Sequence, residues 1–380
     1  MKKIRYCKNC FLNSTIPGLE VGVNGVCSSC LDHEEREYGG GSRGLGFEVV
    51  KKRMEELFFT VKDRRDKVLL KFSGGKDSSY VLYLLKRVYK LDNISSCSVV
   101  FPISSDLSLK NIRLINKMFG SDPLEFKVGI DFYKKFMSKG LIEGYKLDMG
   151  PSVACTFCSY IKDVVCLNKA IENNAKVILC GWDKSQSSDP VFFGGRNAIK
   201  YLEKQYGKVY GIFRDHFPEY RNTVYDMRLE ELDSDHIPAF VSPLTFIDYT
   251  HGDIYKGLEE LGLDRKDLFN SETNCDALEF FNYLSYSYYN SHSNMVSISR
   301  ELRQNGSLTL NNYKISRKEF GEFLQEHKRL LQYCYKKQAS LKECQGIAPT
   351  ILKILGQDRF SNLVERMKRI EYYFNYFGIR

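Results

Sequence analysis

The most distinct hydrophobic pattern in the chain is a short apolar run at residues 67–72, KVLLKF, which leads directly into a pair of glycines. Its length and composition predict a buried strand, and an amphipathic helix is predicted after the glycines at residues 79–89. Strands are then expected at 96–101, 124–128 and 176–180, and helices at 107–119, 132–139 and 155–173. This alternation predicts an α/β fold with a parallel, doubly wound sheet.

The two ends of the chain differ from this alternating region. Residues 34–46 are charged and then glycine-rich, which predicts a linker, and a helix at 47–61 leads into the first strand. After residue 192 the pattern becomes helical and less regular, with helix starts expected near 250, 293 and 316. We therefore expect three domains: residues 1–46, residues 47–245 with the glycine turn, and a helical region at 246–380.

The composition is that of an ordinary soluble globular protein, with 43% hydrophobic and 27% charged residues in a chain of 380. No apolar run approaches the ~20 residues that span a bilayer, and MKKIRYC does not resemble a signal peptide. A cytoplasmic location is therefore expected. The net charge of +9 is spread thinly, so it suits a phosphate-rich ligand as well as tRNA and is weak evidence for nucleic acid.

Twelve cysteines in such a chain predict metal ligands or reactive thiols rather than disulfides. Four of them form two CxxC pairs separated by residues 11–26, a spacing typical of a zinc ribbon. A segment this short and polar has little core, so zinc would supply most of its folding energy. A structural role is favoured over nucleic-acid binding because four thiolates close the metal shell. The predicted zinc ligands are Cys7, Cys10, Cys27 and Cys30.

The turn after the first strand has the chemistry of a phosphate site. Two adjacent glycines let the backbone curl, so that consecutive N–H groups and the positive helix end can converge on an anion. The spacing differs from that of a Walker loop, and a purely structural glycine turn is the alternative. The predicted nucleotide contacts are Ser73, Gly74, Gly75, Lys76, Asp77, Ser78 and Ser79, together with Gly181 and Asp183 in the loop after the strand at 176–180.

Three further cysteines are candidates for chemistry. Cys155 and Cys158 open a predicted helix, where a thiol has a lowered pKa and two thiols can share a metal or exchange a disulfide. Cys275 lies alone in a distant polar loop. Together the three could hold three irons of a 4Fe-4S cluster and leave the fourth open. On spacing alone, a chance position in a surface loop explains Cys275 equally well.

The motif SGGKDSS resembles the PP-loop of the N-type ATP pyrophosphatases, which have an adenine nucleotide alpha hydrolase-like fold. Those enzymes release pyrophosphate and place AMP on an acceptor oxygen. The opening RYCKNCFLNSTIPGLEVGVNGVCSSC, the stretch SGGKDSSYVLYLLK, and residues 299–303 and 315–319 resemble the N-acetyl sugar amidotransferases of bacterial surface-polysaccharide and lipopolysaccharide biosynthesis.

This resemblance implies an enzyme that adenylates the amide oxygen of an N-acetyl sugar and replaces it with nitrogen from ammonia. It implies ATP, Mg²⁺ and Zn²⁺ as cofactors, and a separate glutaminase with an ammonia-channel protein as partners. Lys76 and Asp77 are the expected catalytic residues: Lys76 absorbs phosphate charge, and Asp77 either positions Mg²⁺ or caps the helix.

A second resemblance competes with the first. A CxxC pair at a helix start, followed by a later cysteine, is similar to the tRNA sulfurtransferases that combine a PP-loop with an iron-sulfur cluster. Under this alternative Cys155, Cys158 and Cys275 bind the cluster, and tRNA is the substrate. A non-catalytic nucleotide-binding scaffold is the third hypothesis, and the intact SGGKDSS motif speaks against it.

Overall fold

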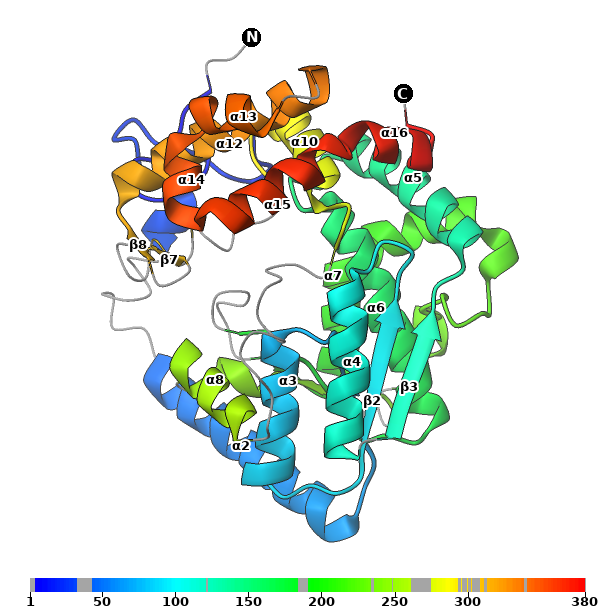
Figure 1. Ribbon diagram of the computed structural model, residues 1–380. Coiled ribbons are helices and arrows are strands. Elements are labelled where there is room, and N and C mark those ends of the chain that lie inside the picture. Colours follow the sequence, from blue (N-terminus) through cyan, green and yellow to red (C-terminus); the bar gives the residue numbers. More distant parts are fainter. Residues whose placement is uncertain are drawn as a thin grey trace. The chain divides into compact units, whose positions relative to one another are not determined.

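The computed structural model divides into two compact units, each described here by itself (Figure 1). The first unit comprises Met1–Gly41, Met137–Cys155 and Asp276–Arg380, and the second comprises Ser42–Phe136 and Thr156–Cys275. The structure describes residues 4–32, 43–120, 122–183, 191–233, 236–247, 249–260, 275–292, 295, 299, 302, 308–310, 313–337 and 340–379. Most of the expected linker and of the expected helix at 293–303 lie outside these residues.

The second unit contains a six-stranded sheet. In spatial order its strands are β3 (Asp122–Lys127), β2 (Ile94–Val100), β1 (Val68–Lys71), β4 (Val177–Leu179), β6 (Ala239–Val241) and β5 (Phe192–Phe193). All neighbours pair in parallel except β5, which is antiparallel to β6. The predicted α/β fold with a mostly parallel sheet is confirmed. β5 and β6 were not predicted, because strands of two or three residues carry no periodic pattern.

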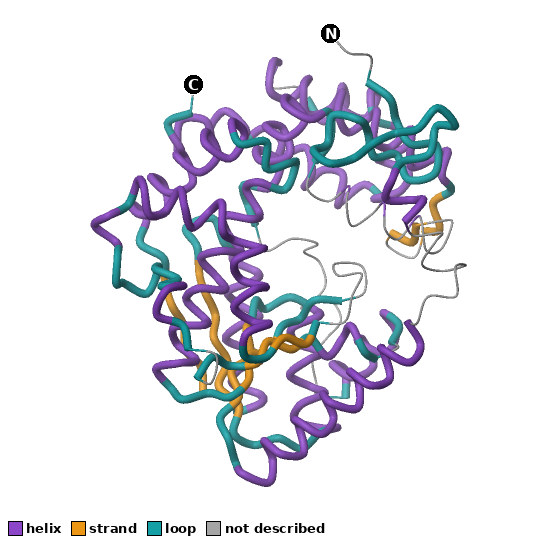
Figure 2. The backbone as a smooth tube through the Cα atoms, turned by 180° about the vertical axis from the view of Figure 1, so that it is seen from behind, coloured by secondary structure: helices purple, strands orange, loops and turns teal. Residues whose placement is uncertain are grey.

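Helices cover both faces of the sheet. Successive side chains of a strand point to opposite faces, so β1 contacts helices on both sides. Val68 and Leu70 of β1 belong to one buried apolar cluster. That cluster also contains residues of α2 (Arg43–Arg64), α3 (Lys76–Tyr83), α4 (Asp106–Phe119) and α8 (His251–Glu259). Lys71 points to the other face and contacts α6 (Val153–Glu172). Figure 2 shows the strands of this unit among the helices.

The order of the strands creates a switch point between β1 and β4. From β1 the chain passes through α3 to β2 and through α4 to β3. It then runs through α5 (Ile130–Lys146) and α6 to β4, which pairs with the opposite edge of β1. Open α/β sheets bind ligands in the crevice outside the carboxyl ends of the strands at such a point. The predicted phosphate turn follows β1, and Gly181 and Asp183 follow β4.

The remaining helical segments are divided between the two units. In the second unit they are the π-helix η1 (Leu84–Val88), which continues α3, α7 (Arg196–His216), η2 (Pro218–Tyr220), η3 (Leu229–Glu231) and η4 (Pro243–Thr245). In the first unit they are α10 (Leu278–Tyr289), α12 (Arg317–Lys337), α13 (Leu341–Ile347), α14 (Pro349–Leu355), α15 (Gln357–Lys368) and α16 (Ile370–Phe377).

The predicted helical C-terminal region is confirmed, but a hairpin of β7 (Leu308–Leu310) and β8 (Tyr313–Ile315) was not predicted. The cysteine-rich N-terminal segment packs on this region within the first unit. The rings of Phe11 and Phe320 meet edge to face at 5.7 Å, and the Ser299 hydroxyl donates to the Cys10 carbonyl at 2.8 Å. In the described part of the chain, none of the helices is both long and apolar enough to cross a bilayer.

Candidate functional site

The phosphate turn has the backbone geometry that its two glycines predict. Gly74 has a φ of +71°, and a Cβ atom at this position would lie 2.5 Å from the Ser108 carbonyl oxygen. Gly75 is the N-cap of α3 in an extended conformation, and no side chain caps the helix. Helix α3 therefore begins at Lys76, earlier than the predicted residue 79. An uncapped helix N-terminus behind a glycine turn favours an anion, through its N–H groups and its dipole.

Helix α4 holds this turn in place. The Ser108 hydroxyl donates to the Ser73 carbonyl at 2.8 Å, and the Asn111 side-chain amide donates to the Gly74 carbonyl at 3.1 Å. Both α4 side chains are buried. Because the carbonyls are bound from behind, the turn is preorganised, and preorganised dipoles need little rearrangement when a ligand binds.

The three predicted serines of the loop differ in their placement. The Ser79 hydroxyl is fully buried and donates to the Gly75 carbonyl at 2.8 Å, so it supports the shape of the turn. The Ser78 hydroxyl lies 3.1 Å from the same carbonyl and 3.2 Å from the Ser73 hydroxyl. The serines thus form a network inside the loop.

Lys76 and Asp77 carry the charges of the loop. The Lys76 ammonium lies 2.6 Å from a carboxylate oxygen of Asp77, and the two side chains are 32% and 23% exposed. Both groups therefore reach solvent, where a surface ion pair contributes little to stability. An incoming phosphate and its metal ion can compete for these charges without disturbing the core.

The loop after β4 contacts the phosphate turn directly. A Cβ atom on Gly181 would lie 2.8 Å from the backbone nitrogen of Ser78, so only glycine fits at this position. The buried Ser242 hydroxyl oxygen lies 2.9 Å from the Cys180 carbonyl and 2.5 Å from the Trp182 carbonyl, and its single hydrogen can be donated to either. The structure thus brings the predicted residue Gly181 against the first turn of α3.

Asp183 and Asp77 share a neighbour that sequence reasoning missed. The ring of Tyr249 packs on Tyr80 of α3 at 5.6 Å. Burial raises the pKa of Tyr249, and the carboxylates of Asp183 and Asp77 raise it further. Because both carboxylates raise the pKa of the Tyr249 phenol, both lie in the region around Tyr249. Carboxylate oxygens are the protein ligands that Mg²⁺ prefers. No signal in the sequence around Tyr249 singles it out.

Lys71 and Trp182 were also missed at this edge of the sheet. Lys71 is the charged last residue of an otherwise apolar buried strand, and the lysine nitrogen lies 4.3 Å from the centre of the Trp182 indole. Two signals were available in the sequence. Lys71 is a charge in an apolar strand, and Trp182, between Gly181 and Asp183, is the only tryptophan of the chain.

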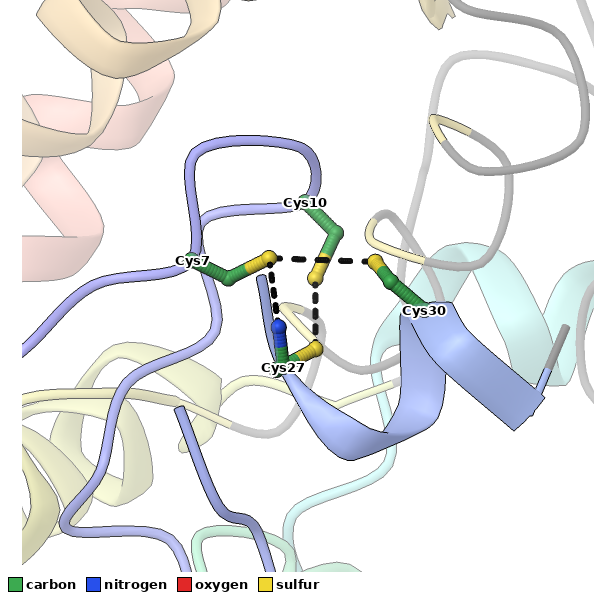
Figure 3. A group of neighbouring side chains, drawn as sticks. All are labelled: Cys7, Cys10, Cys27 and Cys30. Atoms are coloured by element: carbon green, nitrogen blue, oxygen red, sulfur yellow. Dashed lines mark hydrogen bonds between the residues drawn. The ribbon is translucent and has the colours of Figure 1, made fainter. Parts of the chain in front are cut away.

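The four N-terminal cysteines come together as predicted (Figure 3). The Cys7 and Cys30 sulfurs lie 3.7 Å apart, and the Cys10 and Cys27 sulfurs lie 3.6 Å apart. All four thiols are buried, and their sulfurs lie within 4.8 Å of one another. Tetrahedral Zn–S bonds of about 2.3 Å imply sulfur separations of roughly 3.8 Å. The arrangement therefore suits a closed four-thiolate metal site, with zinc as the metal we propose.

The other cysteine candidates are distributed over both units. Cys155 and Cys158 lie one turn apart in α6, and the Cys158 sulfur lies 3.5 Å from the Tyr133 hydroxyl. Cys155 belongs to the first unit, whereas Cys158 and Cys275 belong to the second. Their joint binding of an iron-sulfur cluster stays a prediction.

Cys158 and Cys275 both lie near the segment that follows β2. Tyr133, which contacts Cys158, packs its ring on Phe101 at 5.3 Å, immediately after β2. Cys275 forms an isolated antiparallel bridge with Ser104, just before the N-cap of α4. Because β2 runs parallel to β1, the segments that follow the two strands lie at the same edge of the sheet. Both thiols therefore lie near the edge that carries the phosphate turn.

No protein-family model and no curated protein matches the chain. One similar solved structure is the NH3-dependent NAD synthetase from Campylobacter jejuni subsp. jejuni in complex with the nitrate ion. It is 15% identical to this chain with a TM-score of 0.34, and the alignment covers 68% of this chain and 93% of the synthetase chain. Another is the NMN synthetase from Francisella tularensis, at 9% identity and a TM-score of 0.34, aligned over 69% of this chain and 98% of its own.

The four-cysteine site predicts a bound metal. We expect the purified chain to hold about one zinc ion and the Cys27→Ser variant to lose it, since three thiolates bind more weakly than four. Cys344→Ser removes a buried cysteine outside the group and should retain the metal. Metal content measured by mass spectrometry tests this, and unchanged zinc in Cys27→Ser would refute the ligand assignment.

The contact of Gly181 with Ser78 predicts a position-specific effect of a methyl group. Gly181→Ala should lower the free energy of unfolding by about 1–3 kcal/mol through overpacking, and should weaken ATP binding because α3 must shift. Gly207→Ala is the matched control, because nothing lies within 4 Å of the methyl it adds, in the exposed interior of α7. The control should be neutral or stabilising by about 0.5–1 kcal/mol. Urea unfolding and calorimetric ATP titration of both variants provide the measurement; equal behaviour would contradict the close approach.

Proposed function

We propose that this protein is a PP-loop ATP pyrophosphatase that adenylates the amide oxygen of an N-acetyl sugar and replaces that oxygen with nitrogen from ammonia. The observation that supports this most is the uncapped N-terminus of α3, which follows a two-glycine turn at the switch point of a parallel sheet. We assign this chemistry to residues 47–245, with the zinc ribbon of residues 1–46 and the helical residues 246–380 as flanking domains.

In the first step the amide oxygen attacks the α-phosphorus of ATP. A bond forms between that oxygen and phosphorus, the bond to the bridging oxygen breaks, and pyrophosphate leaves. The N–H groups at the start of α3 and the ammonium of Lys76 stabilise the charge that develops on the phosphates. Asp77 and Asp183 would hold Mg²⁺, which supplies charge neutralisation when it is bound.

In the second step ammonia attacks the carbon of the adenylated amide. The carbon–oxygen bond breaks, AMP leaves with the former amide oxygen, and loss of a proton gives an acetamidino group. A separate glutaminase and an ammonia-channel protein would supply the ammonia. The sugar substrate and these partners are implied by the resemblance of both ends of the chain to the N-acetyl sugar amidotransferases, and the same resemblance favours a cytoplasmic enzyme of lipopolysaccharide biosynthesis.

Removal of the loop cation tests the first step. Lys76→Ala should reduce pyrophosphate release by about 10²–10³-fold, because one charge-stabilising donor is lost, while the fold is kept. Lys117→Ala, an exposed lysine in the last turn of α4, is the control and should behave as wild type. Pyrophosphate release is measured with ATP, ammonium and N-acetyl sugar nucleotides. Undiminished release in Lys76→Ala would make the loop structural, and no ATP consumption with any amide or tRNA acceptor would favour a scaffold.

A second candidate function is tRNA thiolation with an iron-sulfur cluster. The placement of Cys158 and Cys275 at the segment after β2 supports it, because an open iron site there could carry the incoming sulfur. Adenylation of a base oxygen would use the same phosphate turn, and sulfur would then displace AMP.

Anaerobic purification distinguishes the two functions. Under amidotransfer we expect a colourless protein without stoichiometric iron, since ammonia needs no metal carrier. The Cys275→Ser variant should then match wild type in iron content and pyrophosphate release. A brown protein whose iron and visible absorption disappear in Cys158→Ser and Cys275→Ser would instead establish the cluster, with Cys344→Ser as the cysteine control that keeps both.

A further inference from the structure

A lysine ends the central strand at a point where the neighbouring positions are apolar. Lys71 follows Val68, Leu69 and Leu70, all of them buried, and its own side chain is only 15% exposed. Its ammonium forms an ion pair with Asp163 of α6, whose side chain is 1% exposed. Strand alternation turns Lys71 away from the apolar cluster that contains Leu70 and toward the opposite face of the sheet.

Both carboxylate oxygens of Asp163 have a hydrogen-bond partner. One carboxylate oxygen of Asp163 accepts from Lys71, and the other accepts from the hydroxyl of Tyr206 in α7. Burial lowers the pKa of Lys71. The charge and hydrogen bond of Asp163, together with the neighbouring thiols of Cys180 and Cys166, outweigh burial and hold that pKa above its usual value. A buried ion pair is weak evidence for stability, since apolar residues of similar size often serve equally well. A positioning role gives a reason for a charge at this place.

The partner that Lys71 positions is Trp182. The Lys71 ammonium lies 4.3 Å from the centre of the indole, within the range of a cation–π interaction. On the same residue, the carbonyl of Trp182 accepts from the Ser242 hydroxyl at 2.5 Å. The loop of residues 181–183 is therefore held at its backbone by Ser242, and its indole contacts the Lys71 ammonium and, at 6.2 Å between ring centres, Tyr201.

This loop is the one that meets the phosphate turn. Gly181, immediately before Trp182, lies against the first turn of α3. The carboxylate of Asp183, immediately after Trp182, raises the pKa of Tyr249, as the carboxylate of Asp77 does. A displacement of the indole would therefore move both a contact of the phosphate turn and a candidate metal ligand.

We propose that Lys71 is a positioning residue: it holds the Trp182 indole and thereby sets the 181–183 loop against the phosphate turn. Its effect on catalysis rests on the proposed function, whereas its effect on the loop does not. In this role Lys71 acts through Trp182 rather than on the substrate.

The test uses the full chain with four variants. Lys71→Met removes the cation, and Lys71→Met with Asp163→Asn removes it without leaving an unpaired buried carboxylate. Lys71→Arg keeps a cation that can pair with Asp163 and stack on the indole. Lys67→Met removes an exposed lysine just before the same strand and is the control.

The first readout is the fluorescence of Trp182, which is the only tryptophan of the chain. Acrylamide quenching should increase in both Lys71→Met variants, because the indole loses its fixed position, and should match wild type in Lys71→Arg and Lys67→Met. Wild-type quenching in both methionine variants would overturn the proposal, whether or not the chain hydrolyses ATP.

The second readout is pyrophosphate release at saturating ATP, corrected for folded protein. The double variant should lose about 10²-fold in kcat, the effect expected of a misplacement near 1 Å, and Lys71→Arg should recover most of it. Altered quenching with wild-type kcat would make Lys71 purely structural and overturn the positioning role. If wild type itself releases no pyrophosphate, the proposed function fails, and the quenching result decides the positioning of the loop.

Discussion

The second unit depends on the close approach of backbone to backbone at two glycines. Gly74 brings the phosphate turn against α4, and Gly181 brings the loop after β4 against α3. A side chain at either position would overlap main-chain atoms, which cannot move without shifting a helix. The first contact places the turn after β1 on α4, and the second places the loop after β4 beside that turn. Backbone groups held in this way suit a phosphate, because main-chain N–H groups at fixed positions bind it without reorganisation.

The sequence predicted the parts of this arrangement that local chemistry determines. An apolar run before adjacent glycines and an amphipathic stretch after them allow few structures other than strand, turn and helix, and β1, Gly74 and α3 follow that pattern. The CxxC pairs were predictable for the same reason, because two fixed spacings let four thiols meet around one ion. The start of α3 was misplaced because Asp77 and Ser78 resemble residues that precede a helix, whereas here they form its first turn.

The missed residues share a different cause: their importance arises from contacts between distant parts of the chain. Lys71 and Asp163 are separated by 92 positions, and neither position alone predicts the other. The ring of Tyr249 packs on α3, and this packing brings its phenol near the carboxylates of Asp77 and Asp183. No local sequence pattern encodes that contact. Strand β6 is recognisable as a strand because its neighbour β4 provides the hydrogen bonds, and its three residues alone carry too little information.

The first unit shows how the same reasoning underestimated a core. The metal was expected to supply most of the folding energy of the ribbon segment, yet Leu12, Val21 and Val26 are buried together with Met295. Leu324 of α12 packs against this cluster, and Phe11 contacts Phe320. The apolar face that the segment could not bury alone is thus covered by the C-terminal helices, and this packing stabilises the segment whether or not the four thiols hold a metal. That apolar face is therefore occupied inside the first unit.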